Sequence, residues 1–503
     1  MTFDELLALV SLDNAPLLCA DSRLVKEGDV FVAIEGNSYD GHDFIGEALA
    51  NGAKYIVCQR PQALSAKPEA YPEKENMQYE LVIVEDSAKA AALLAQASRG
   101  NPASRLTNLA VTGTNGKTTV AFLVRSCIQA AGEACGLIGT VIYDTGSVSS
   151  EAVLTTPDCL AIAEMTLQMV KAGSEYMVIE ASSHSLSQSR LEGINFKAAA
   201  FTNLGGDHLD YHKTKEDYLA AKTKLFEALL PDATAVLNKE SSEAVQIAQK
   251  TSAKILWYAV DTPTQLNAHI ESMDISETVF TLEYADQRLR VKTSLLGRHN
   301  VSNSLAAAGL CIAAGFDLRT IAAGLSALRT IPGRLERVDG DGGFSADYER
   351  DIGCLGGPTT FIDYAHTDDA LRNVLSTLKP FCKAKLTVVF GCGGDRDRTK
   401  RPCMARTAED LADFVIVTSD NPRTERPEDI IRDIIVGFVN PDSQKIVVEP
   451  DRRKAIELAI NNASENDIVL IAGKGHETYQ IIGKQRFDFN DKKIAQGYLK
   501  KLR

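Results

Sequence analysis

The sequence predicts an α/β protein of three domains, in which helices cover largely parallel sheets. Two observations support this. Short β-rich apolar runs alternate with helical patterns along most of the chain, and 503 residues correspond to about three domains of ordinary size. Examples of the runs expected to be strands are Tyr55–Cys58, Leu81–Val84, Asn108–Thr112, Tyr176–Glu180, Leu386–Phe390, Phe414–Thr418 and Ile468–Ala472.

Two breaks in this alternation indicate where the domains meet. Residues 98–104 are polar and rich in glycine, proline and asparagine, and residues 331–334 read Ile-Pro-Gly-Arg. We therefore place the domains at residues 1–98, 99–332 and 333–503. The stretch Asp339–Thr360 holds six glycines and little periodicity, so we expect a surface loop there.

Composition excludes several classes of partner. The chain has 54 basic and 67 acidic residues, a net charge of −13, which argues against nucleic acid and anionic membranes. No apolar stretch is long enough to cross a membrane, and no signal peptide opens the chain. Ten cysteines are scattered without a Cys-x-x-Cys pair, which is typical of reduced thiols. We expect a cytoplasmic monomer that does not insert into membranes.

A glycine-rich loop follows the expected strand Asn108–Thr112, and Lys117 opens a helical pattern. Strand, glycine turn and helix form a phosphate cradle, because backbone N–H groups and the helix N-terminus face the anion. Lys117 would neutralise the β- and γ-phosphates, and the Thr118 hydroxyl would bind Mg²⁺. Val111 stands where the general motif has its first glycine, so a purely structural glycine turn is the alternative. The loop consists of Gly113, Thr114, Asn115, Gly116, Lys117, Thr118 and Thr119.

Two further residues of the middle region have chemistry that suits this loop. Glu180 ends an expected strand, where a carboxylate would face a metal beside the phosphates; a capping glutamate is the alternative. Lys222 lies on the apolar face of the expected helix Glu216–Leu229, whereas Lys224 does not. Burial lowers the pKa of a lysine, and the neutral amine reacts with CO₂ to give a carbamate. A lysine that reaches out to solvent is the alternative.

Three polar loops follow expected strands in the last third of the chain: residues 393–398, 420–423 and 473–477. Loops at the carboxyl ends of parallel strands form a crevice in which ligands bind. Arg396 and Arg423 could each hold a carboxylate in a fork, while Glu477 could hold an ammonium group. This set suits a zwitterionic diamino dicarboxylic acid; three purely structural loops are the alternative.

The string Thr-Gly-Thr-Asn-Gly-Lys-Thr-Thr at residues 112–119 resembles the phosphate loop of the Mur ligases and the related folylpolyglutamate synthetases. These enzymes use ATP to form amide bonds through an acyl phosphate. The resemblance extends over nearly the whole chain, with three local departures: Gly205 replaces a hydroxyl residue, Asp368 replaces a proline, and the loop Asp339–Thr360 is longer than expected. Further matching segments are Asp21–Arg23, Ala181–Ser185, Thr202–His212, Leu296–Val301, Gly333–Glu336, Asp363–His366 and Asp420–Arg423.

The resemblance implies an N-terminal UDP-binding domain, a central P-loop ATPase domain and a C-terminal Rossmann-like domain. It implies that His208 and a carbamylated Lys222 hold a second Mg²⁺, and that Glu180 and Thr118 hold the first. For the nucleotide it implies Asn300, Arg334 and Asp363. For the UDP-muramyl dipeptide it implies Ser22, Asn37, Ser38, Tyr39, Thr155, Thr156, Ser182, Gln188 and Arg190. For the incoming amino acid it implies Arg396, Asp420, Asn421, Pro422, Arg423, Gly473 and Glu477.

The reaction implied by the resemblance is ATP-dependent, ADP-forming ligation of meso-diaminopimelate to the D-Glu γ-carboxylate of UDP-MurNAc-L-Ala-D-Glu. The Asp-Asn-Pro-Arg string favours diaminopimelate, because lysine has no second carboxylate for the arginine to bind. Ligases that add L-lysine or D-Ala-D-Ala are the near alternatives. A P-loop regulatory ATPase without ligase activity is an alternative from another class, but it leaves Lys222 and the three C-terminal loops unexplained.

Overall fold

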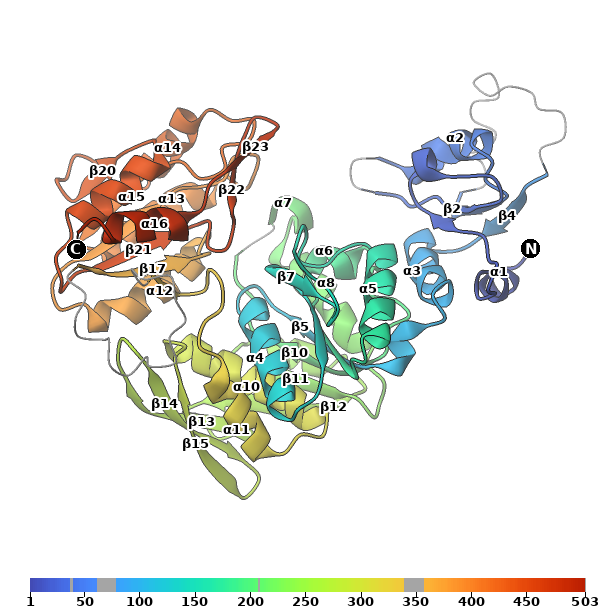
Figure 1. Ribbon diagram of the computed structural model, residues 1–503, viewed down its shortest axis with the longest axis horizontal. Coiled ribbons are helices and arrows are strands. Elements are labelled where there is room, and N and C mark those ends of the chain that lie inside the picture. Colours follow the sequence, from blue (N-terminus) through green and yellow to red (C-terminus); the bar gives the residue numbers. More distant parts are fainter. Residues whose placement is uncertain (37–38, 61–77, 207–208, 339–356, 503) are drawn as a thin grey trace.

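The computed structural model describes residues 1–36, 39–60, 78–206, 209–338 and 357–502. Three α/β bodies follow one another along the molecule, with the central one between the two terminal ones (Figure 1). Each contains a sheet whose strands are mostly parallel, so the predicted fold class is confirmed. Among the described residues, no helix is long and apolar enough to cross a membrane.

The N-terminal body has a four-stranded parallel sheet of order β1-β2-β3-β4. Leu6 and Val10 on its first helix and Leu94 on its last are buried against the sheet, and this apolar face is what holds these short elements together. The strands are β1 (Leu18–Cys19), β2 (Val30–Val32), β3 (Tyr55–Cys58) and β4 (Glu80–Ile83), and the helices are α1 (Phe3–Val10), α2 (Ile45–Ala50) and α3 (Ser87–Ala97).

The central sheet has eleven strands in the order β15-β14-β13-β12-β11-β10-β5-β9-β6-β7-β8. The seven from β13 to β6 are parallel, and an antiparallel pair extends each edge. The parallel strands are β5 (Thr107–Thr112), β6 (Cys135–Ile138), β9 (Tyr176–Glu180), β10 (Phe196–Phe201), β11 (Thr234–Asn238), β12 (Lys254–Val260) and β13 (Leu266–Met273). The antiparallel ones are β7 (Ile142–Asp144), β8 (Ser149–Glu151), β14 (Thr278–Tyr284) and β15 (Gln287–Thr293).

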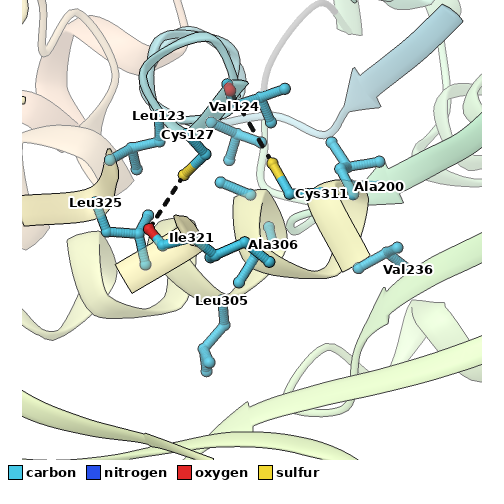
Figure 2. Packing of buried hydrophobic residues seen from close by; sticks show 14 of the residues in the cluster. Leu123, Val124, Cys127, Ala200, Val236, Leu305, Ala306, Cys311, Ile321 and Leu325 are labelled. Atoms are coloured by element: carbon cyan, nitrogen blue, oxygen red, sulfur yellow. Dashed lines mark hydrogen bonds between the residues drawn. The ribbon is translucent and has the colours of Figure 1, made fainter. Parts of the chain in front are cut away.

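Helices cover both faces of this sheet. On one face, Leu123 and Val124 pack against Leu305, Ile321 and other apolar residues in the core drawn in Figure 2. Cys127 and Cys311 fill space in the same core, and every cysteine in the described segments carries a free thiol. The helices are α4 (Lys117–Ala130), α5 (Cys159–Lys171), α6 (Ser183–Ser187), α7 (Leu209–His212), α8 (Lys215–Glu227), α9 (Glu243–Ala248), α10 (Arg298–Ala313) and α11 (Leu318–Ala327).

The C-terminal body has a six-stranded sheet of order β16-β17-β21-β18-β19-β20, parallel except for β16. Because β21 is inserted between β17 and β18, the loops that follow these three strands and β19 meet at one carboxyl edge. The strands are β16 (Glu336–Val338), β17 (Thr359–Asp363), β18 (Leu386–Phe390), β19 (Phe414–Val417), β20 (Ile446–Val448) and β21 (Ile468–Ala472), with a hairpin of β22 (Tyr479–Ile482) and β23 (Gln485–Asp488). The helices are α12 (Asp368–Leu378), α13 (Lys400–Leu411), α14 (Pro427–Ile435), α15 (Arg452–Asn461) and α16 (Asp491–Leu499).

All seven predicted strands are present, with ends displaced by at most one residue. The predicted helix Glu216–Leu229 corresponds to α8, which Thr214 caps by accepting from the Asp217 N–H. The predicted loop Asp339–Thr360 is wrong at its end, because Thr359 and Thr360 already pair with β21. The rest of that prediction, residues 339–356, lies outside the described residues.

Candidate active site

The loop after β5 has the geometry of a phosphate cradle. Gly113 and Gly116 have φ angles of +144° and +93°, which side chains disfavour, and a Cβ at Gly113 would lie 1.9 Å from Thr202 Oγ1. Helix α4 begins at Lys117, so its N-terminal N–H groups face the loop. The Lys117 ammonium donates to the carbonyl oxygens of Gly113 and Thr114, both at 2.9 Å, which places its charge over the cradle.

Glu180 ends β9 beside this loop, as the sequence predicted, and is fully buried. Its Oε2 accepts from Thr118 Oγ1 at 3.0 Å and from Thr140 Oγ1 at 2.9 Å, and its Oε1 accepts from the Thr140 N–H at 2.8 Å. A buried carboxylate beside a hydroxyl is a set of hard oxygen ligands of the kind that Mg²⁺ prefers, so these residues fit that ion. Thr140 was not predicted; its position just past the end of β6 is the only clue that the sequence offers.

Lys222 is buried on α8, with 1% of its surface exposed, whereas Lys224 on the same helix is exposed. Its ammonium donates to the Gly113 carbonyl at 2.9 Å and lies 4.2 Å from the centre of the Tyr218 ring. The apolar-face prediction is therefore confirmed, and the structure brings Lys222 to the same carbonyl as Lys117. The carbamate stays a prediction, and His208 lies outside the described residues.

A cavity of about 870 Å³ extends from the phosphate loop to the C-terminal body. The predicted nucleotide residues Asn300, Arg334 and Asp363 all line it. Arg334 spans the two bodies: its Nη2 donates to Thr118 Oγ1 at 3.1 Å, and its guanidinium stacks 4.6 Å from the centre of the Tyr364 ring. Lining residues that sequence reasoning missed include Met273, His299, Asn303, Thr377, Pro380 and Phe381.

Local hydrogen bonds hold the predicted nucleotide residues in place. Asn300 donates from Nδ2 to the Leu296 carbonyl at 2.7 Å. Asp363 accepts from the backbone N–H groups of Leu335 and Ala365 at 2.6 and 2.7 Å, and burial raises the pKa of its carboxyl. Both side chains are therefore fixed before any ligand arrives.

Two of the departures from the family pattern, Gly205 and Asp368, lie near one another where the central and C-terminal bodies meet. The Gly205 N–H donates to Thr114 Oγ1 at 2.8 Å, and a Cβ at Gly205 would lie 2.9 Å from Asp369 Oδ2 on α12. A glycine there permits that close approach between the two bodies. Asp368 is the first residue of α12, where an acidic side chain is favourable, and Thr367 still caps the helix.

A second cavity, of about 340 Å³, lies at the carboxyl edge of the C-terminal sheet. The three predicted loops meet there, so the crevice is confirmed. Of the residues predicted for the amino acid, Pro422 does not line the cavity. Its carbonyl oxygen packs against Gly394, so closely that a Cβ on Gly394 would lie 2.0 Å from it. The predicted residues that do line it are Arg396, Asp420, Asn421, Arg423, Gly473 and Glu477.

Buried cations hold the carboxylates of this second cavity. Glu477 Oε2 accepts from Lys474 Nζ at 2.9 Å and from Asn421 Nδ2 at 2.8 Å, and Lys474 is fully buried. Burial raises the pKa of Asp420, but Lys474 and Arg452 outweigh it and hold that pKa below its usual value. The cavity is thus lined both by carboxylates, those of Asp397, Asp420 and Glu477, and by the guanidinium groups of Arg396 and Arg423.

A brace that the sequence did not reveal connects two of these loops. Arg401 on α13 has a fully buried side chain that donates to both oxygens of Glu425, at 2.7 and 2.9 Å, and to Asp433 at 2.8 Å. Glu425 Oε1 also accepts from the Asp395 N–H at 2.6 Å, and Arg423 Nη1 donates to the Gly394 carbonyl at 2.8 Å. In the sequence, Arg401 stands in a polar stretch where an exposed side chain is the ordinary expectation.

The predicted residues for the acceptor substrate fall into two groups. In the central body, Thr156 Oγ1 contacts Ser182 Oγ at 3.1 Å, and Arg190 donates to the Thr156 carbonyl at 2.7 Å. Thr155 contacts Thr140 at 3.1 Å, and Gln188 accepts from Arg190 at 2.6 Å.

The second group lies in the N-terminal body. Ser22 is buried and donates to Glu47 at 2.7 Å, while Tyr39 is 76% exposed. Asn37 and Ser38 lie outside the described residues. The structure therefore connects the central group to Glu180, whose backbone carbonyl accepts from Thr156 Oγ1 at 2.6 Å, and leaves Ser22 and Tyr39 on a separate body.

Three family models match the chain in succession. They are the Mur ligase family catalytic domain at residues 17–99, the Mur ligase middle domain at 111–311 and the Mur ligase glutamate ligase domain at 351–475. The UDP-N-acetylmuramoyl-L-alanyl-D-glutamate–2,6-diaminopimelate ligase of Geobacillus thermodenitrificans is 41% identical over 489 residues, which cover 96% of this chain and 94% of that protein. The enzyme of the same name from Bacillus cereus is 40% identical over 483 residues, 95% and 92% of the two chains.

Solved structures give the same result. A UDP-N-acetylmuramoyl-L-alanyl-D-glutamate–2,6-diaminopimelate ligase structure aligns with a TM-score of 0.64 at 32% identity and covers 99% of this chain and 98% of its own. MurF from Acinetobacter baumannii aligns with a TM-score of 0.62 at 19% identity over 93% and 95% of the two chains, which shows the fold alone.

Proposed function

The chain belongs to the Mur ligase family, and from that premise we propose that it joins meso-2,6-diaminopimelate to the D-Glu γ-carboxylate of UDP-MurNAc-L-Ala-D-Glu, with ATP as co-substrate and ADP as product. One observation carries the proposal. The cavity that holds Arg396, Arg423 and Glu477 opens beside the cavity of the phosphate loop, and two residues are common to both linings. An amino acid and an activated carboxylate can meet there.

The first step activates the acceptor. ATP binds with its phosphates on residues 113–119, where Lys117 neutralises the charge that develops on the transferred group. Thr118 and Glu180 would hold Mg²⁺, which supplies further neutralisation of the phosphates. The γ-carboxylate of the D-Glu residue attacks the γ-phosphorus, the bond from that phosphorus to the β,γ-bridging oxygen breaks, and ADP leaves as the acyl phosphate forms. Thr155, Thr156, Ser182, Gln188 and Arg190 hold the dipeptide, and Ser22 and Asn37–Tyr39 hold the uridine diphosphate.

The second step joins the amino acid. Arg423 and Arg396 each bind a carboxylate of diaminopimelate, and Glu477, with Asp420 and Asn421 beside it, binds an ammonium group. L-Lysine would leave one guanidinium without a carboxylate, which is the physical basis of discrimination against it. The free amine attacks the acyl carbon and phosphate departs. Most of the catalytic effect comes from bringing three substrates together in one geometry.

We assign the carbamate to Lys222 within this proposal. It is buried and lies at the phosphate loop, where an anionic carbamate, together with His208, would hold a second Mg²⁺. The proposal also includes domain divisions at 98/99 and 332/333, a monomer, and reaction in the cytoplasm, where ATP is available.

Phosphate release measured with UDP-MurNAc-L-Ala-D-Glu and a panel of amino acids tests the proposal. We expect release with meso-diaminopimelate and little with L-lysine or D-Ala-D-Ala. Release that is independent of any amino acid would support a regulatory ATPase instead, and release with L-lysine alone would support the lysine-adding alternative.

A further inference from the structure

His366 occupies the boundary between the two cavities. It lies in the loop between β17 and α12, and among the described residues only Tyr364 and His366 line both cavities. The loop is held at both ends: Asp363 accepts from the Ala365 N–H at 2.7 Å, and Thr367 caps α12. The His366 side chain therefore has a defined place between the nucleotide side and the amino-acid side.

The tautomer of His366 follows from one contact. Nδ1 lies 2.8 Å from the Tyr364 carbonyl oxygen, which can only accept, so Nδ1 carries the proton in the neutral imidazole. The lone pair of the neutral ring is then on Nε2. The rings of Tyr364 and His366 pack with their centres 4.6 Å apart, which restricts the imidazole further.

The charged groups that face His366 carry both signs. Asp420, which lines the same cavity, interacts with the imidazolium electrostatically. The other charged or titratable groups that line the second cavity are Glu477, Arg396, Asp397, Lys400 and Arg423 from the C-terminal body and His184 from α6. Arg334 lies on the nucleotide side, and His476 also interacts with His366 electrostatically. Burial raises the pKa of Tyr364, so the phenol beside His366 stays protonated and is no proton acceptor.

The reaction needs a proton acceptor at this boundary. A zwitterionic amino acid enters with an ammonium group, whose nitrogen has no lone pair to attack the acyl carbon. Glu477 already accepts from Lys474 and Asn421 through one oxygen, so its position suits holding the ammonium group rather than removing its proton.

We propose that His366 is a catalytic base of the ligation, an inference that rests on the function proposed above. Nε2 takes one proton from the ammonium group, and the freed electron pair forms the new C–N bond with the acyl carbon. The C–O bond to phosphate breaks, and its electron pair leaves on phosphate. The second proton lost by the nitrogen goes to that phosphate, which departs as the hydrogen phosphate dianion, and His366 later returns its proton to solvent.

The test compares two nucleophiles in the whole enzyme with ATP and UDP-MurNAc-L-Ala-D-Glu. Meso-diaminopimelate needs deprotonation, whereas hydroxylamine is neutral at the assay pH and traps the acyl phosphate as a hydroxamate without a base. In His366→Gln we expect ligation of diaminopimelate to fall by about 10²–10⁴-fold. Hydroxamate formation should stay at the wild-type rate, and added imidazole should recover part of the lost ligation.

His269→Gln, the same change at an exposed residue of β13, is the matched control and should behave as wild type. Equal loss of both reactions in His366→Gln would overturn the proposal, and so would full retention of ligation. The same pattern in His184→Gln but not in His366→Gln would also overturn it. A failure of the proposed function shows separately, because the wild-type enzyme would then form no amide with diaminopimelate.

Discussion

Replacing Arg423 by lysine tests how the second cavity recognises its ligand. The Arg423 backbone is held on both sides, by its N–H to the Ile481 carbonyl at 3.1 Å and by the Gly483 N–H to its carbonyl at 2.7 Å. Its φ of +51° lies in the left-handed region, which is equally unfavourable for lysine, so the substitution leaves backbone strain unchanged. What changes is the head group alone.

The expected magnitude follows from the contacts of that head group. Nη1 donates to the Gly394 carbonyl at 2.8 Å, which leaves the other guanidinium nitrogens for a carboxylate. A lysine ammonium is a single point of charge, so it cannot keep the hydrogen bond to the Gly394 carbonyl and also bind a carboxylate through two parallel hydrogen bonds. Losing one charged hydrogen bond costs about 1.5–3 kcal/mol, or roughly 10- to 160-fold in kcat/KM for diaminopimelate.

Steady-state phosphate release at varied diaminopimelate and varied ATP measures both effects. KM for ATP should not change, because the phosphate loop lies in the central body. Arg426→Lys is the matched control, since Arg426 is 78% exposed and close in sequence. A comparable loss toward ATP, or no loss toward diaminopimelate, would refute the assigned role of Arg423.

Three further predictions concern residues around the site. Lys222→Ala should abolish ligation at any bicarbonate concentration while the exposed control Lys224→Ala retains it; near-wild-type turnover in Lys222→Ala would contradict the carbamate. Arg401→Met should lower the free energy of unfolding by about 2–3 kcal/mol in urea titrations, because Glu425 and Asp433 lose a buried cation but remain partly hydrated. The same change should raise KM for diaminopimelate. Unchanged stability would show that the contacts of Arg401 are unimportant. Burial lowers the pKa of His299 to about 4, below the value of about 6.5 in the unfolded chain. Between these pH values the unfolded chain binds more protons than the folded chain, so the free energy of unfolding should rise with pH from about 4 to 6.5. Urea titrations across that range should show a shallower rise for His299→Gln, and an equal slope would refute this.

The strands could be predicted because strands buried on both faces of a parallel sheet are continuous apolar runs. The same logic located the ligand loops, since residues 113–119, 393–398, 420–423 and 473–477 all follow such runs directly. Lys222 was predictable because helical spacing alone places it on the buried face.

The parts that escaped prediction depend on contacts between segments distant in the sequence. Thr140 holds Glu180 from the turn that follows β6, and no local pattern marks it. Arg401 is buried only because Glu425 and Asp433 come to it from another helix and loop. The outermost strands β8 and β15 are largely exposed and have mixed composition, which weakens their apolar pattern.

The central claim is that a carboxylate is activated on the phosphate loop and then attacked by an amine held in the second cavity. Transfer of ¹⁸O tests it most directly, with UDP-MurNAc-L-Ala-D-Glu labelled in the D-Glu γ-carboxylate and meso-diaminopimelate as the amine. An acyl phosphate predicts that each phosphate released carries one ¹⁸O atom, detected by mass spectrometry together with the tripeptide product. Unlabelled phosphate would show that water, and not the carboxylate, attacks ATP, and would contradict the account.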